Sequence, residues 1–195
     1  MKLYVVADRG IFSTDREWLD RLGRVARAIA DQPVVRLQVR TKTAAPARRA
    51  SLAARAREVI VASGGEALLD RTFLNGTTSD AIAAGYRGAH WPEVAIPAEP
   101  EARAGQLAVG ASVHSSAALR AAEAAGAWFV LFGPVFDPRS KAGRGVGLEA
   151  LCGVANRARV PVVAIGGITP ARVASCLSRS STGGACCAEH EGDLG

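Results

Sequence analysis

The chain has almost no lysine and no long apolar run. Lys2, Lys42 and Lys141 are the only lysines in 195 residues, so arginine carries most of the formal charge of +6. No apolar stretch approaches the ~18–20 residues that cross a bilayer. Residues 1–8 are a short apolar stretch closed by an aspartate, without the apolar region and cleavage site of a signal peptide. We therefore expect a cytoplasmic protein with no membrane partner.

Aromatic residues are also scarce, at 5% of the chain. Binding of single-stranded nucleic acid relies on aromatic side chains set among basic ones, and no such interleaving occurs here. Several arginines fall instead in alanine-rich stretches such as 44–58 and 117–125, at the spacing of outward helix faces. These features predict a solvated basic surface and no nucleic-acid partner.

Cysteine offers no metal or redox motif. The chain has four, Cys152, Cys176, Cys186 and Cys187. Their spacing matches neither a zinc site nor a C-x-x-C pair. We interpret them as reduced structural residues and expect no metal ligands among them.

Short β-rich runs alternate with amphipathic, alanine-rich stretches along the whole chain. The predicted strands are residues 3–7, 34–40, 72–75, 88–91, 107–113, 128–135 and 161–168. The predicted helices are residues 15–30, 47–62, 79–84, 115–125, 148–157 and 170–177. Such alternation implies a parallel sheet, and this many strands favours a (β/α)₈ TIM-type barrel over a flavodoxin-like or Rossmann sheet.

The last 18 residues differ from the rest. We assign residues 1–177 to the barrel and residues 178–195 to a diverged tail in place of the last β-α unit. Within it only residues 183–188 have a strand-like pattern, and no helical pattern follows. An eighth unit is therefore doubtful or truncated on sequence grounds. An incomplete barrel end would expose strand edges and favour a homodimer that covers them.

Polar residues alternate along the second predicted strand. Gln38, Arg40 and Lys42 share a face with Arg36, opposite the apolar residues. Because helices cover the outside of such a barrel, the polar set is expected to point inward, toward the carboxyl end where barrel enzymes bind their ligands. An anionic ligand would balance the two cations. The alternative is an ion pair with a carboxylate of a neighbouring strand.

Ser112 and His114 end the fifth predicted strand and share a face. Histidine suits proton transfer near neutral pH, so His114 is a candidate acid/base, with a purely structural histidine as the alternative. His90, at the end of the fourth strand, is interpreted as a packing or hydrogen-bonding residue.

Two loops have the composition of anion sites. Residues 132–147 form a glycine- and proline-rich loop, too long for a simple β-α connection of ~2–6 residues. Its Lys141 and Arg144 suit a phosphate or diphosphate, unless the loop is only a solvated basic one. Gly166 and Gly167 follow the seventh strand and precede a helix, where backbone N–H groups can approach a phosphate.

Together these segments resemble the thiamine phosphate synthase/TenI family of (β/α)₈ barrels, over residues 3 to about 177. The weaker matches are Leu74-Asn75 and Gly88-Ala89-His90. The strongest matches are Gln38-Val39-Arg40-Thr41-Lys42, Gly110-Ala111-Ser112-Val113-His114-Ser115, Phe132-Gly133-Pro134-Val135-Phe136 leading to Lys141, and Ala164-Ile165-Gly166-Gly167-Ile168.

The resemblance implies one of two activities. Synthases join a pyrimidine diphosphate to a thiazole phosphate with magnesium, whereas TenI-like proteins isomerise a thiazole with a histidine acid/base. The two magnesium aspartates of the synthase pattern correspond here to Gly76 and Ala95, which have no side-chain oxygen, with Glu93 nearby. The threonine pair before the family lysine is reduced to Pro138 and Ser140.

The departures favour a TenI-like thiazole tautomerase with His114 as the acid/base, no cofactor and a small phosphorylated thiazole as partner. The alternatives are a magnesium-dependent synthase and a non-catalytic phosphate-ligand binder. By the same resemblance, Gly166 and Gly167 would hold the phosphate, and Arg40 and Lys42 would offset the ligand's charge. The remaining substrate-binding residues would be Gln38, Asn75, Ser112, Ser140 and Lys141.

Overall fold

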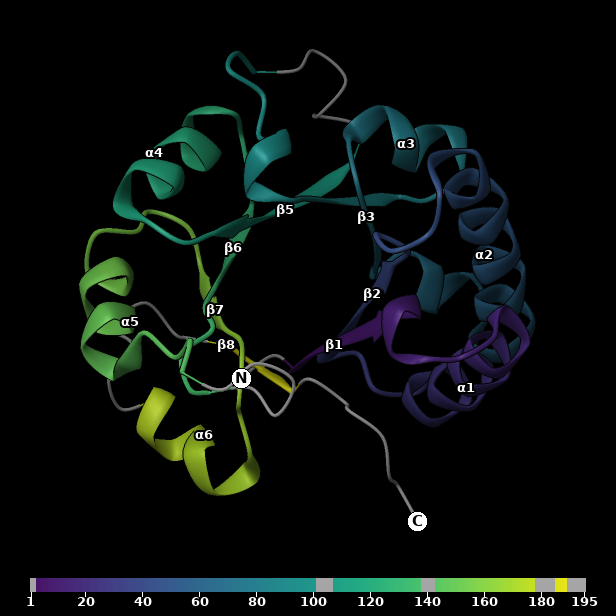
Figure 1. Ribbon diagram of the computed structural model, residues 1–195, viewed down its shortest axis with the longest axis horizontal. Helices are drawn as coiled ribbons and strands as arrows, with labels where there is room; N and C mark the ends of the chain where they lie inside the picture. Colours follow the sequence, from purple (N-terminus) through teal and green to yellow (C-terminus); the bar gives the residue numbers. More distant parts are fainter. Residues whose placement is uncertain (1–2, 101–106, 138–142, 178–184, 189–195) are drawn as a thin grey trace.

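The protein is a closed barrel of parallel strands surrounded by helices (Figure 1). The computed structural model describes residues 3–100, 107–137, 143–177 and 185–188. Neighbouring strands in the sequence are neighbours in the sheet, in the order β1 to β8, and β8 closes onto β1. The predicted fold class is confirmed.

Strands and helices alternate as expected. The strands are β1 Leu3–Asp8, β2 Val35–Arg40, β3 Thr72–Asn75, β4 Gly88–Trp91, β5 Ala108–Val113, β6 Phe129–Phe132, β7 Val162–Ala164 and β8 Ala185–Ala188. The helices are α1 Asp15–Ile29, α2 Pro46–Leu69, α3 Thr78–Ala83, α4 Ser116–Ala124, α5 Gly147–Ala155 and α6 Pro170–Leu177, with short 3₁₀ turns η1 Arg9–Ile11 and η2 Glu93–Ala95. No helix in the described ranges is both long and apolar enough to span a membrane.

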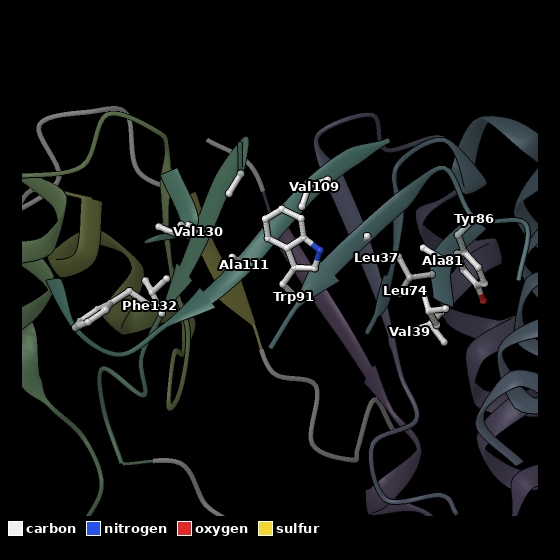
Figure 2. Close-up of a cluster of buried hydrophobic side chains, with 14 of the residues drawn as sticks. Leu37, Val39, Leu74, Ala81, Tyr86, Trp91, Val109, Ala111, Val130 and Phe132 are labelled. Carbon is white, nitrogen blue, oxygen red and sulfur yellow. The ribbon is translucent and has the colours of Figure 1, made fainter. Parts of the chain in front are cut away.

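Outward strand residues form the main core, between the sheet and the helices. Trp91, Val109, Ala111, Val130 and Phe132 gather in one such layer (Figure 2), and each is at most 3% exposed. Their period-two spacing is the reason why the alternate residues must face the barrel axis. The main core therefore fixes which side chains the interior receives.

A separate cluster of side chains fills the barrel interior near the amino ends of the strands. Tyr4, Phe73 and Phe129 pack there with ring centroids 5.2–5.9 Å apart. The guanidinium of Arg36 lies 5.7 Å from the ring of Phe73 and 5.4 Å from that of Phe129, a cation–π arrangement. Such filling is usual for barrels of this size and leaves only the carboxyl end for a ligand.

The eighth strand, which the sequence left in doubt, is present. Ala185–Ala188 pairs in parallel with β1 on one side and with β7 on the other. The exposed edges of β1 and β7 that an absent strand would leave are thus covered by backbone pairing. Of the expected tail 178–195, only this strand belongs to the described residues.

Helix α2 runs further than predicted. The pattern suggested an end near residue 62, whereas α2 extends to Leu69 across a break at Gly65, whose φ of 74° and ψ of 175° are not helical. Glycine accepts this backbone without a Cβ clash. The predicted end therefore falls short of the break, and the second helical segment was not predicted.

Candidate active site

The strand ends of β4, β5 and β6 bring the predicted histidine to the barrel mouth. His114 follows β5, and its Nδ1 lies 2.6 Å from the carbonyl oxygen of Gly133, which follows β6. A carbonyl oxygen only accepts hydrogen bonds, so Nδ1 of His114 carries the proton and donates it. Nε2 of a neutral His114 is therefore the basic nitrogen.

A second contact fixes the backbone of His114. Its N–H donates to Oε2 of Glu93, at the start of η2, across 2.7 Å. From the sequence, Glu93 was a candidate only as a substitute magnesium ligand. In the structure its carboxylate instead supports the residue that carries the candidate base.

The glycine pair after β7 packs directly on the loop after β6. Gly166 and Gly167 have φ values of 92° and 61°, a backbone region that favours glycine. A Cβ on Gly166 would lie 2.5 Å from Cα of Pro134, and one on Gly167 would lie 2.7 Å from the carbonyl oxygen of Asp137. Both glycines are thus required by shape as well as by backbone conformation.

The backbone bonds between these loops leave the glycine N–H groups available. Val135 N–H donates to the carbonyl of Ile165, and Phe136 N–H donates to that of Gly166, at 2.8 and 3.0 Å. Within the described part of the chain, no group accepts a hydrogen bond from the N–H of Gly166 or Gly167. Two adjacent donors at the start of a helix are suited to a phosphate.

Arg172 and Asp137 hold this pair of loops in place. Nη1 of Arg172 donates to the carbonyl of Gly167 across 2.8 Å, and its guanidinium lies 4.6 Å from the ring centroid of Phe136. The Asp137 carboxylate accepts from the N–H of Gly145 at 2.8 Å. The backbone N–H groups of Gly145 and its neighbours hold the pKa of Asp137 below its usual value. Neither role was predicted from the sequence, in which a cation in the first turn of the helix after a glycine pair is the available signal for Arg172.

The inward polar face of β2 is confirmed in part. Gln38 is buried at 3% exposed, and Arg40 points to the mouth, where it forms an ion pair with Asp8 at the end of β1. This pair is the alternative that the sequence analysis weighed against an anionic ligand. Lys42 lies beyond the strand and is exposed, so it does not continue the inward row.

Two further predicted residues, Asn75 and Ser112, contact His90. Nδ2 of Asn75 donates to the His90 carbonyl across 3.3 Å, and Ser112 Oγ lies 2.9 Å from the Nε2 atom of His90. His90 itself is fully buried, as expected for a hydrogen-bonding residue. Ser140 and Lys141 lie outside the described residues, so their predicted roles stay predictions.

The magnesium positions of the synthase pattern do not offer a ligand set. Gly76 and Ala95 have no side-chain oxygen, and the neighbouring carboxylates are engaged: Asp80 accepts from the N–H of Thr77 at 2.9 Å, and Glu93 from that of His114. Nowhere in the described ranges do three His, Cys, Asp or Glu side chains gather closely enough to hold a metal ion. The residues present at these positions do not fit the ion.

Comparison with known proteins identifies relatives of this chain. The family model described as thiamine monophosphate synthase matches residues 3–189, a range that includes β8. A protein named thiamine-phosphate synthase from Methanoculleus marisnigri is 37% identical over 190 residues, which are 93% of this chain and 83% of that protein. A relative from Geobacter sulfurreducens is 36% identical over 118 residues, and the match spans only 55% of its length.

A solved structure shows the same fold. Thiamine phosphate pyrophosphorylase from Pyrococcus furiosus superposes with a TM-score of 0.65 at 27% identity, covering 95% of this chain and 84% of that one. The whole-chain family match and the similarity to the Methanoculleus protein lead to one conclusion: this chain belongs to the thiamine monophosphate synthase family.

Proposed function

We propose that this protein of thiamine biosynthesis is a TenI-like thiazole tautomerase in which His114 transfers the proton. The observation that best supports this proposal is the 2.6 Å hydrogen bond from His114 Nδ1 to the Gly133 carbonyl. It fixes the tautomer of the imidazole and leaves Nε2 as the base. A fixed tautomer keeps the same ring nitrogen available both to accept the proton and to return it.

The proton balance is simple. Nε2 of His114 takes a proton from the thiazole, which leaves the electron pair in the conjugated ring system and makes the imidazole a cation. The Gly133 carbonyl stabilises this cation through Nδ1. Nε2 then returns the proton to a different atom of the same ring system, so the product is an isomer and the histidine is neutral again.

The phosphate would bind next to this base. Gly133 contacts both parts of the site: it accepts from His114, and a Cβ on it would overlap the carbonyl of Ile165, immediately before Gly166. The N–H groups of Gly166 and Gly167, which have no acceptor among the described residues, would hold the phosphate oxygens. The exposed Lys42 and the Arg40 guanidinium would add positive charge at the mouth.

The test is isomerisation of the thiazole carboxylate phosphate with all divalent metal chelated. We expect turnover by the wild-type protein and a loss of about 10²–10⁴-fold in kcat for His114→Ala. Melting of both proteins with the ligand serves as the control, because the variant should still bind the phosphate and be stabilised by it. Full activity of His114→Ala would overturn the assignment, and stabilisation of the wild type without turnover would indicate a non-catalytic binder.

A second candidate is thiamine-phosphate synthase, favoured by the name of the Methanoculleus relative. It requires transfer of a pyrimidine from its diphosphate to the thiazole phosphate, with release of diphosphate. The donor set at Gly76 and Ala95 does not suit the magnesium that this reaction uses in the family. Incubation with both substrates and magnesium distinguishes the two activities: thiamine phosphate that appears only with the metal would favour the synthase.

A further inference from the structure

A buried hydrogen-bonded chain leads from the barrel interior to the mouth. His90 is fully buried on β4, and each ring nitrogen has a partner. Nδ1 lies 3.3 Å from the hydroxyl of Tyr4 on β1, and Nε2 lies 2.9 Å from Oγ of Ser112 on β5. Tyr4 is buried as well, whereas Ser112 is half-buried and marks the end of the chain nearest the candidate base.

The imidazole in this chain is neutral. Burial, with a smaller effect from the charge of Arg40, lowers the pKa of His90 to about 3. A neutral imidazole has one donor nitrogen and one acceptor nitrogen, so the three groups must all point their hydrogens in the same direction. Hydrogen bonds aligned in this way polarise one another.

An anionic ligand at the mouth selects the direction. If Tyr4 donates to Nδ1, then Nε2–H donates to Ser112, and the Ser112 hydroxyl has its hydrogen left for the ligand. The opposite order would turn the oxygen of Ser112 toward the anion. A donor hydroxyl is favoured beside negative charge, because hydrogen bonds to ionised acceptors are about twice as strong as neutral ones.

We propose that His90 is a positioning residue that orients the Ser112 hydroxyl as a donor to an anionic or electron-rich atom of the bound thiazole phosphate. This inference rests on the proposed function for the ligand's identity. His90 contacts no substrate in this scheme and acts only through Ser112. The Tyr4 hydroxyl fixes the tautomer of His90 through Nδ1.

A double-mutant cycle tests that dependence. The affinity for the thiazole carboxylate phosphate is measured by calorimetry for the wild type, Ser112→Ala, His90→Leu and the double variant. We expect each single variant to bind about fivefold to tenfold more weakly. The double variant should bind no more weakly than Ser112→Ala, because His90 has no effect once the hydroxyl is gone. Multiplied losses in the double variant would overturn the inference.

Two further variants separate positioning from packing. His90→Gln keeps an amide N–H at the position of Nε2 and should recover most of the affinity that His90→Leu loses. Tyr4→Phe should weaken binding, whereas the matched control Tyr86→Phe should not. Tyr86 is equally buried, and its hydroxyl donates to the carbonyl of Ala53 at 2.9 Å, in the main core. Equal effects of the two tyrosine variants would show a general loss of stability and overturn the inference.

The outcomes also separate this inference from the function on which it rests. A wild-type protein that binds no thiazole phosphate refutes both. Normal binding and turnover by the wild type, with independent effects of His90 and Ser112, refutes only the positioning role.

Discussion

His114 and Gly133 join the ends of adjacent strands through a single side-chain contact, in which Nδ1 donates to the carbonyl oxygen 2.6 Å away. The carbonyl belongs to the residue that also packs against Ile165. The orientation of His114 and the position of the loop that holds Gly166 and Gly167 therefore both depend on Gly133. Changes on either side of it provide direct tests.

Glu93 is expected to matter through its hydrogen bond to the His114 N–H. Glu93→Ala removes the acceptor and should lower kcat for isomerisation about tenfold, with a smaller change in KM, since a charge-assisted hydrogen bond contributes roughly 1.5–3 kcal/mol. Glu93→Gln keeps an amide oxygen as acceptor and should retain most of the activity. Steady-state kinetics of the two variants decide the point; equal losses would mean that the charge, rather than the hydrogen bond, is needed.

Gly166→Ala is expected to abolish phosphate binding and to destabilise the protein. Gly126 supplies the matched control, because its φ of 93° is nearly that of Gly166, while a Cβ there would meet nothing within 4 Å. Gly126→Ala should lower the free energy of unfolding by about 1–2 kcal/mol from backbone strain alone. Gly166→Ala should exceed this, because its Cβ overlaps Pro134. Denaturant unfolding of both variants gives the comparison; equal losses would contradict the packing argument.

Arg71 directly precedes β3, at the amino ends of the strands, and is expected to contribute strongly to stability there. Its guanidinium donates to four carbonyls, those of Ile29, Ala30, Val35 and Ala67, at 2.6–3.1 Å. Arg71→Ala should lower the free energy of unfolding by roughly 2–3 kcal/mol, a fall in Tm of about 5–10 °C. Arg24→Ala, at an exposed position of α1, should change Tm little. A melting experiment that finds the two variants alike would refute the role of Arg71.

His90 should make stability depend on pH. Its pKa is about 3 in the folded protein, below its ordinary value of 6.5. Below pH 6.5 the unfolded chain therefore binds a proton that folded His90 does not, and stability falls as the pH decreases toward 3. The slope from this residue is at most about 1.4 kcal/mol per pH unit. Urea unfolding between pH 7 and pH 4.5 should show a flatter profile for His90→Gln than for the wild type.

The sequence was sufficient to predict which strand side chains face the barrel interior, because this depends only on local periodicity. Arg36 and Gln38 lie inside, and Leu37 and Val39 lie outside, as the alternation required. The ion-pair partner of Arg40 could not be identified from the sequence, because it depends on the register that aligns Asp8 of β1 with Arg40 of β2. The alternation within β2 sets which face Arg40 occupies, but it does not identify the residue of β1 that lies opposite Arg40.

The end of β6 was misjudged for a similar reason. The apolar Val135 suggested a strand to residue 135, whereas β6 ends at Phe132. Val135 and Phe136 instead donate to the carbonyls of Ile165 and Gly166 in the next loop. An apolar pattern reports burial, and here the burial comes from loop packing.

The position of Arg36 over Phe73 and Phe129 has a kinetic consequence. With that end of the barrel filled, a molecule that enters at the mouth must also leave there. A reaction with one substrate and one product needs no order of arrival. Joining two substrates in the same space would require the deeper one to arrive first, and the product would compete with it for the same entrance.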